Sequence, residues 1–169
     1  PSVIASLIID NVTTNSVSLS WSSPIGNISS YIIQLLGIPS NELILDTNST
    51  IVDQLIPGNY YTFTVFAIAG NINGPKTENS TFTVPSVIAN LVIDNVTSTS
   101  MSLSWASPVG NISSYIIQIQ GTPSKELIVN TNFSLVDELT PGNYYTFVVF
   151  ATAGKMNGTT TENSTFTGK

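Results

Sequence analysis

The chain has 169 residues, among which there is no cysteine and no histidine, and its basic residues are four lysines. These absences exclude thiolate nucleophiles, imidazole bases, disulfides and thiolate or imidazole metal sites. Arginine is also absent, and a formal net charge of −6 repels nucleic acid and anionic membrane surfaces. We therefore expect neither an enzyme nor a protein that binds nucleic acid.

The chain is apolar for a protein with so few ions. Charged residues make up 8% of the sequence, hydrophobic residues 41%, and the mean hydropathy is +0.27. Solubility must then come from neutral polar groups, from attached sugar, or from both. No run approaches the roughly 18 apolar residues of a membrane span, and no signal peptide is visible. We expect a soluble piece of a longer protein that does not itself enter a membrane.

The sequence repeats itself at an offset of 84 residues without a gap, with about 70% of aligned positions identical. Both copies begin with PSVIA, GNISSYIIQ starts at 26 and at 110, and PGNYYTF starts at 57 and at 141. No Gly/Ser-rich spacer lies between the copies. The repeat predicts two domains, residues 1–84 and 85–169.

In chain order, the first copy contains seven segments rich in residues that favour β-strands. They are VIASLII at 3–9, SVSLSWS at 16–22, SSYIIQLL at 29–36, ELILD at 42–46, STIVDQL at 49–55, NYYTFTVFAIA at 59–69 and NSTFTV at 79–84. Gly, Pro and Asn turn signals separate them, and no stretch has helical periodicity. The predicted fold class is all-β, with two consecutive seven-stranded antiparallel β-sandwiches.

Alternation within the strands predicts which side chains face the core. The expected inward set in the first copy is Val17, Leu19, Trp21, Tyr31, Ile33, Leu35, Tyr61, Phe63, Val65 and Ala67. Residues of the opposite parity should face outward. Four of these are apolar and are expected to form a patch: Ile32, Leu36, Phe66 and Ile68. Two explanations stay open, namely β-propensity with shielding by sugar or a neighbouring domain, and a contact with another protein. The second copy has Ile116, Gln120, Phe150 and Thr152 at these positions, which makes the patch half polar there.

Over the whole of both copies, the chain resembles fibronectin type III modules. The residues that carry the resemblance are a Trp closing the second strand, an aromatic residue opening the third, and a Leu-x-Pro-Gly-x-x-Tyr turn. They are Trp21, Tyr31, Leu55 and Tyr61 in the first copy, and Trp105, Tyr115, Leu139 and Tyr145 in the second. The resemblance implies that these residues are core or corner residues, and that Tyr61 and Tyr145 each form a tyrosine corner by bonding nearby backbone. An immunoglobulin domain, the nearest rival, would need cysteines for its inter-sheet disulfide.

The Asn-x-Ser/Thr acceptor motif for N-linked sugar is the most frequent short motif. It occurs at Asn11, Asn27, Asn48, Asn79, Asn95, Asn111, Asn132, Asn157 and Asn163. A sequence rich in Asn, Ser and Thr also makes such motifs by chance, and duplication explains why several recur in both copies. The shortage of charge favours glycans independently, because a hydrophobic chain needs another solubilising layer.

The carboxylates are the remaining candidates for catalysis or metal binding. They are scattered, without the convergent loop of a calcium site or the facing pair of a glycosidase. No base is available to activate the Ser and Thr hydroxyls. We assign no catalytic residue, no metal ligand and no cofactor. The Arg-Gly-Asp tripeptide that some fibronectin modules use for recognition is also absent, since the loop reads GNINGP at 70–75 and GKMNGT at 154–159.

The resemblance implies non-catalytic spacer, adhesion and protein-interaction modules from a longer extracellular protein. The phrases NVTTNSVSLSW and LIPGNYYTFTVFA resemble repeats in receptor-type tyrosine phosphatase ectodomains, which suggests a cell-surface receptor as the parent. Two alternatives stay open: a secreted structural or adhesive protein made of many similar repeats, and a secreted microbial polysaccharide-degrading enzyme that uses such modules as spacers. The protein partner, the oligomeric state and the parent are not identified by the sequence.

Overall fold

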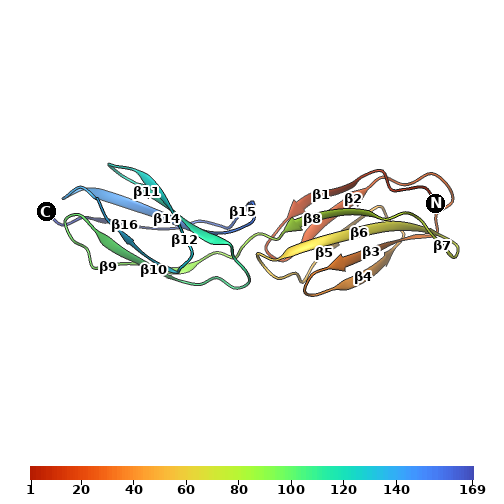
Figure 1. Ribbon diagram of the computed structural model, residues 1–169, viewed down its shortest axis with the longest axis horizontal. Coiled ribbons are helices and arrows are strands. Elements are labelled where there is room, and N and C mark those ends of the chain that lie inside the picture. Colours follow the sequence, from red (N-terminus) through yellow and green to blue (C-terminus); the bar gives the residue numbers. More distant parts are fainter. The chain divides into compact units, whose positions relative to one another are not determined.

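The structure is a computed structural model that describes residues 1–169. The chain divides into two compact units, Pro1–Val84 and Pro85–Lys169, called here the first and second repeat. Each unit is built from strands alone (Figure 1). The prediction of an all-β chain made of two sandwiches is therefore confirmed.

The first repeat contains seven main strands and one two-residue strand. They are β1 (Leu7–Val12), β2 (Val17–Trp21), β3 (Ser30–Leu36), β4 (Asn41–Leu45), β5 (Ser49–Val52), β6 (Tyr60–Ala69), β7 (Ile72–Asn73) and β8 (Thr77–Phe82). One sheet has the order β1-β2-β5. The other has the order β4-β3-β6-β7, and β8 also pairs with β6.

The second repeat has the same sequence of elements and the same topology. Its strands are β9 (Ala89–Asp94), β10 (Met101–Ala106), β11 (Ser114–Gln120), β12 (Lys125–Val129), β13 (Phe133–Val136), β14 (Tyr144–Ala153), β15 (Met156–Asn157) and β16 (Thr161–Phe166). The sheets have the orders β13-β10-β9 and β12-β11-β14-β15, with β16 also paired to β14. Every pairing in the chain is antiparallel.

Each repeat has a core of its own between its two sheets. The long central strand β6 supplies its largest aromatic side chains, because Tyr61 and Phe63 are fully buried. The whole predicted inward set of the first repeat is buried, as are Leu55 and Val52. Alternation places these residues on one face, and aliphatic and aromatic burial then provides the main favourable term for folding.

Three strands differ by two or more residues from the sequence-based prediction, and one of them is β8, which covers Thr77–Phe82 instead of 79–84. The first was expected over residues 3–9, but β1 begins at Leu7, and the carbonyl of the buried Ile4 accepts a hydrogen bond from Thr77 Oγ1 at 2.8 Å. The strand expected over 49–55 ends at Val52. Two residues later Gln54 has a φ of 58°, a left-handed conformation that cannot continue a strand.

One edge of each sandwich is closed by side chains instead of a ladder. In the first repeat, β8 and β1 belong to different sheets but lie side by side (Figure 1). Asn79 Nδ2 on β8 donates to the Leu7 carbonyl at 2.9 Å. Together with the Thr77 bond to Ile4, this joins the two sheets at their edge. The second repeat has the same two bonds, from Thr161 to Ile88 at 3.0 Å and from Asn163 to Leu91 at 2.9 Å.

Candidate functional site

The tyrosine of the Pro-Gly turn is bonded on both sides in each repeat. Tyr61 is fully buried, and its hydroxyl accepts a hydrogen bond from the Ile56 amide at 2.9 Å and donates to the Ile38 carbonyl. In the second repeat, the Tyr145 hydroxyl accepts from the Thr140 amide at 3.0 Å and donates to the Thr122 carbonyl. One phenol thus connects the turn before its strand with the turn after the third strand. Leu55 and Leu139, which precede these turns, are buried.

The two tryptophans are core residues with an unusual feature. Trp21 packs edge-on against Tyr31 with ring centroids 5.4 Å apart, and Trp105 against Tyr115 at 5.2 Å. All four rings are buried. Neither indole N–H has a hydrogen-bond acceptor. Edge-to-face packing therefore provides the specific contact of the two indoles, which contribute no polar group to the surface.

The apolar patch expected on the outer face of the first repeat is not open. Phe66 does lie on that face, opposite Ile32 in the ladder, but it is only 4% exposed. Lys76 covers it, with Nζ 5.5 Å from the ring centroid, and the same ammonium donates to Gln34 Oε1 at 2.9 Å. A central-strand aromatic with neighbours on both sides is buried by them even when it faces away from the core.

The remaining patch residues are separated by polar ones. Leu36 is exposed, yet Gln34 lies between it and Ile32 on the same face of β3. Ile32 and Ile68 are half-buried. Gln34 also donates to Glu42 at 2.9 Å, so a polar row crosses the middle of the sheet. The expected contiguous apolar surface is thereby divided.

Aromatic pairs that each contain an exposed tyrosine occur at one end of the same face in both repeats. Tyr60 and Phe82 lie directly opposite each other with ring centroids 4.9 Å apart, and Tyr144 and Phe166 are 4.8 Å apart. The two tyrosines are each 53% exposed. Sequence reasoning missed these pairs, because the register between β6 and β8 is needed to bring their members together.

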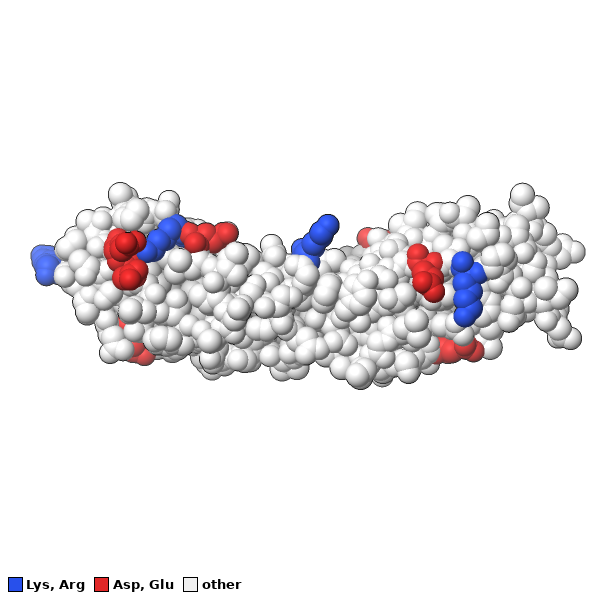
Figure 2. Space-filling model, in the orientation of Figure 1, with Lys and Arg blue, Asp and Glu red and all other residues white.

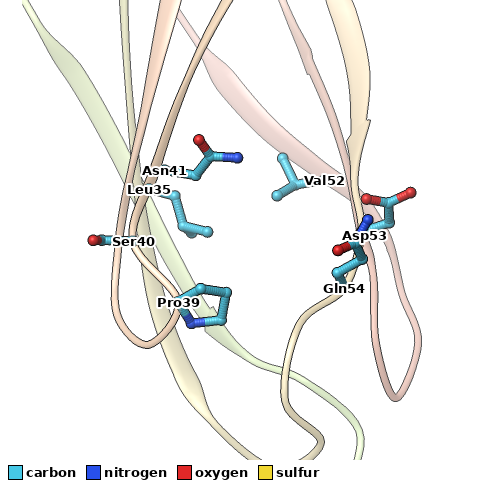
Figure 3. Close-up of a pocket in the computed structure, with 7 residues that line it drawn as sticks. All are labelled: Leu35, Pro39, Ser40, Asn41, Val52, Asp53 and Gln54. Carbon is cyan, nitrogen blue, oxygen red and sulfur yellow. The ribbon is translucent and has the colours of Figure 1, made fainter.

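A pocket of about 180 Å³ lies at the other edge of the first sandwich, opposite the one closed by Asn79. One wall is formed by the β3–β4 turn and its flanks, the other by the end of β5 and the residues after it (Figure 3). The first wall contains Leu35, Pro39, Ser40 and Asn41, and the second Val52, Asp53 and Gln54. The pocket therefore combines an apolar floor with carboxylate and amide groups at its rim.

In the second repeat, the corresponding edge is bridged by a lysine. Lys125, at the start of β12, donates to the Asp137 carbonyl at 2.7 Å. Its ammonium is 3.8 Å from the Asp137 carboxylate and 3.7 Å from that of Glu138. The two repeats thus share a fold but differ in how this edge is closed.

The carboxylates elsewhere do not converge. Charged side chains are few and scattered on the face shown in Figure 2, most of which is uncharged. Within residues 1–169, no group of three or more Asp, Glu, His or Cys side chains is placed to hold a metal ion. None of the chain's elements is a helix long and apolar enough to span a membrane.

The glycosylation motifs fall into two groups. Asn79 is half-buried, and its Nδ2 atom, where sugar would be attached, donates to Leu7. The Nδ2 atoms of Asn132 and Asn163 also donate to backbone carbonyls, those of Trp105 and Leu91. Apart from Asn79, every acceptor is an exposed residue: Asn11, Asn27, Asn48, Asn95, Asn111, Asn132, Asn157 and Asn163.

Both repeats match the same known domain family. The model of the fibronectin type III domain matches residues 2–83 and again residues 85–167. The chain belongs to the fibronectin type III family. Its two repeats are therefore tandem fibronectin type III domains, and a fibronectin type III domain is a non-catalytic module.

Relatives of these fibronectin type III repeats include two kinds of protein. Receptor-type tyrosine-protein phosphatase eta of Gallus gallus is 32% identical over 161 residues, covering 90% of this chain and 12% of that protein. Human receptor-type tyrosine-protein phosphatase H is 30% identical over 171 residues, with 94% and 15% covered, and mouse tenascin-R is 28% identical over 166 residues, with 92% and 12% covered. These relatives are extracellular or cell-surface proteins, and the chain spans only a small part of each.

A solved structure agrees on the fold. A segment of two fibronectin type III domains from chicken tenascin matches 96% of this chain and 98% of its own, with a TM-score of 0.72 and 21% identity.

The pocket of the first fibronectin type III repeat was missed by sequence reasoning. A comparison of the two copies could have indicated it. The neutral Asn41 and Gln54 correspond to the oppositely charged Lys125 and Glu138 in the second copy.

Proposed function

We propose that the two repeats are spacer, adhesion and protein-interaction modules from the ectodomain of a cell-surface receptor, with a receptor-type tyrosine phosphatase as the first candidate. The observation that carries the proposal is the 32% identity to receptor-type tyrosine-protein phosphatase eta over 90% of the chain. The repeats themselves contribute no catalysis under this proposal. The absence of histidine, cysteine and arginine supports that part, because the usual nucleophiles and bases are lacking.

A secreted adhesive protein is the second candidate. It is favoured by the 28% identity to mouse tenascin-R and by the close similarity of the two repeats to each other. Arrays of near-identical modules provide length and multiple binding sites without new contacts. Both candidates place the repeats outside the cell.

The sequence that flanks the repeats in the full-length transcript separates the candidates. A receptor predicts an apolar segment of about 20 residues downstream, followed by a cytoplasmic domain. Further repeats with no such segment would contradict the receptor and select the adhesive protein.

We also propose that exposed acceptor asparagines carry N-linked glycans. The support is the exposure of eight of the nine acceptor asparagines, combined with a surface poor in charge. The test is peptide mass spectrometry of natively secreted material before and after removal of glycans with a glycosidase. Sugar at Asn27 and Asn48 is expected, and unmodified peptides throughout would contradict the proposal.

A further inference from the structure

The walls of the pocket in the first repeat are almost the same as the corresponding surfaces of the second. Pro39, Ser40, Val52 and Asp53 have identical counterparts, and Leu35 is replaced by an isoleucine. Asn41 becomes Lys125 and Gln54 becomes Glu138. In the second repeat, nearly the same walls therefore surround a longer cationic side chain, because Lys125 stands where the first repeat has Asn41.

In the second repeat, the group bound between these walls is the primary ammonium of Lys125. Lys125 Nζ donates to the Asp137 carbonyl at 2.7 Å and lies within 4 Å of two carboxylates. The side chain is only 24% exposed, so its aliphatic stem is largely covered while its head meets the acceptors. A backbone carbonyl and carboxylates converging on one point match the three donors of an ammonium group.

The first repeat presents the Asp53 carbonyl and carboxylate without a cation, and has the Gln54 amide where the second repeat has the Glu138 carboxylate. Gln54 has a φ of 58° and Glu138 a φ of 57°, so the backbone after β5 turns in the same way as after β13. Asp53 is exposed, and neither of the chain's two ion pairs involves it. Asn41 is too short to take the place of a lysine, and its Oδ1 atom accepts a hydrogen bond from the Glu42 amide at 2.8 Å.

We propose that this pocket binds the side chain of a lysine from a protein partner. The ammonium would donate to the Asp53 carbonyl and lie near the Asp53 carboxylate, and its stem would pack along Leu35 and Val52. Figure 3 shows the space between the two walls into which Asn41 and Val52 project. A net charge of −6 favours approach of a cationic partner. A lysine fits better than an arginine, because the acceptors converge on a point and do not form a planar fork.

This inference goes beyond the proposed function, because it depends only on the pocket and its counterpart. The test is therefore done on the two-repeat chain, whatever its parent protein. The uniformly ¹⁵N-labelled chain is titrated with N-acetyl-lysine methylamide, while amide shifts are followed by NMR. We expect saturable shifts at Asn41, Asp53 and Gln54 with a Kd of about 1–10 mM. The norleucine analogue, which lacks the ammonium, should bind at least about tenfold more weakly.

Two variants make the assignment specific. Asn41→Lys should fill the pocket from within and abolish the shifts, whereas the same change at the exposed Asn71, outside the pocket, should leave them unchanged. In the second repeat, the double variant Lys125→Asn and Glu138→Gln should create a new response at Asp137. Absence of shifts in the unmodified chain, equal shifts with norleucine, or full binding by Asn41→Lys would each overturn the proposal.

Discussion

Tyr61 is the residue on which the turn geometry of the first repeat most depends. Its hydroxyl bonds two separate turns from a fully buried position, so Tyr61→Phe leaves the Ile56 amide and the Ile38 carbonyl without that partner. We predict a loss of about 1–3 kcal/mol in the free energy of unfolding of the first repeat. Denaturant unfolding followed through assigned amide signals measures each repeat separately. The neighbouring control, Tyr60→Phe, concerns a 53% exposed ring and should change stability by less than about 0.5 kcal/mol.

Gly37 is required by the same tyrosine. Its φ is 147°, and a Cβ placed there would lie 2.5 Å from Tyr61 Cδ1. Gly37→Ala therefore adds a steric clash to an unfavourable backbone conformation, and we predict a loss of more than about 3 kcal/mol. Gly70→Ala is the matched control, because Gly70 has a φ of 59° but open space around it. Gly70→Ala should lower the free energy of unfolding by only about 1 kcal/mol. Similar losses for the two variants would show that the contact with Tyr61 is unimportant.

At this scale, alternation in the sequence predicts which side of a sheet a residue faces, but not how far its neighbours cover it. Val17, Leu19 and Trp21 are buried because their face is the core. Phe66 is buried on the opposite face, because Lys76 extends over its ring from the adjacent chain segment. That contact requires the register between β6 and the segment leading into β8, which local pattern does not provide.

Among the elements, β8 is held against β1 by side chains. Asn79→Ala removes the bond from Nδ2 to the Leu7 carbonyl and leaves that partly buried acceptor unpaired. We predict a loss of about 1–2 kcal/mol, together with faster hydrogen exchange at the amides of β8. Asn48→Ala, at an exposed acceptor motif, serves as the control and should leave both quantities unchanged. Equal exchange rates in the two variants would contradict a role for Asn79 in joining the sheets.

At the opposite edge, Lys125 bridges β12 and the end of β13. Its two carboxylate partners are 69% and 85% exposed, so solvent screens the ion pairs strongly. We predict that Lys125→Asn lowers the stability of the second repeat by no more than about 1 kcal/mol, and that high salt reduces the difference further. Denaturant unfolding at low and high salt measures both effects. Lys155→Asn, which changes an exposed lysine outside these ion pairs, is the control. A loss above about 2 kcal/mol would mean that the bridge is structurally dominant.

The elements themselves follow from sequence pattern to different degrees. β2 and β6 have strict alternation and rich β-propensity, so their position is predictable. The start of β1 is not, because Ile4 belongs to the core without being in a ladder and takes its hydrogen bond from Thr77. The pocket next to β4 depends on two elements that belong to different sheets, and only a comparison of the two copies hints at it.

For the molecule as a whole, each repeat has a complete core, and the two core clusters share no residue. Phe63→Ala should cost about 3–5 kcal/mol, a large part of the stability of a domain this small. We predict that it shifts unfolding of the first repeat to lower denaturant while the amide signals of the second repeat keep their midpoint. A common midpoint that moves for both repeats would contradict two separate folding units.

We propose that these fibronectin type III repeats act outside the cell as part of a membrane-held receptor. The most direct measurement uses an antibody raised against residues 1–169 on intact cells that express the natural protein, followed by carbonate extraction of their membranes. We expect staining without permeabilisation and retention of the epitope in the membrane pellet. Staining that appears only after permeabilisation would contradict an extracellular position, and release of the epitope into the carbonate wash would contradict a membrane-held receptor.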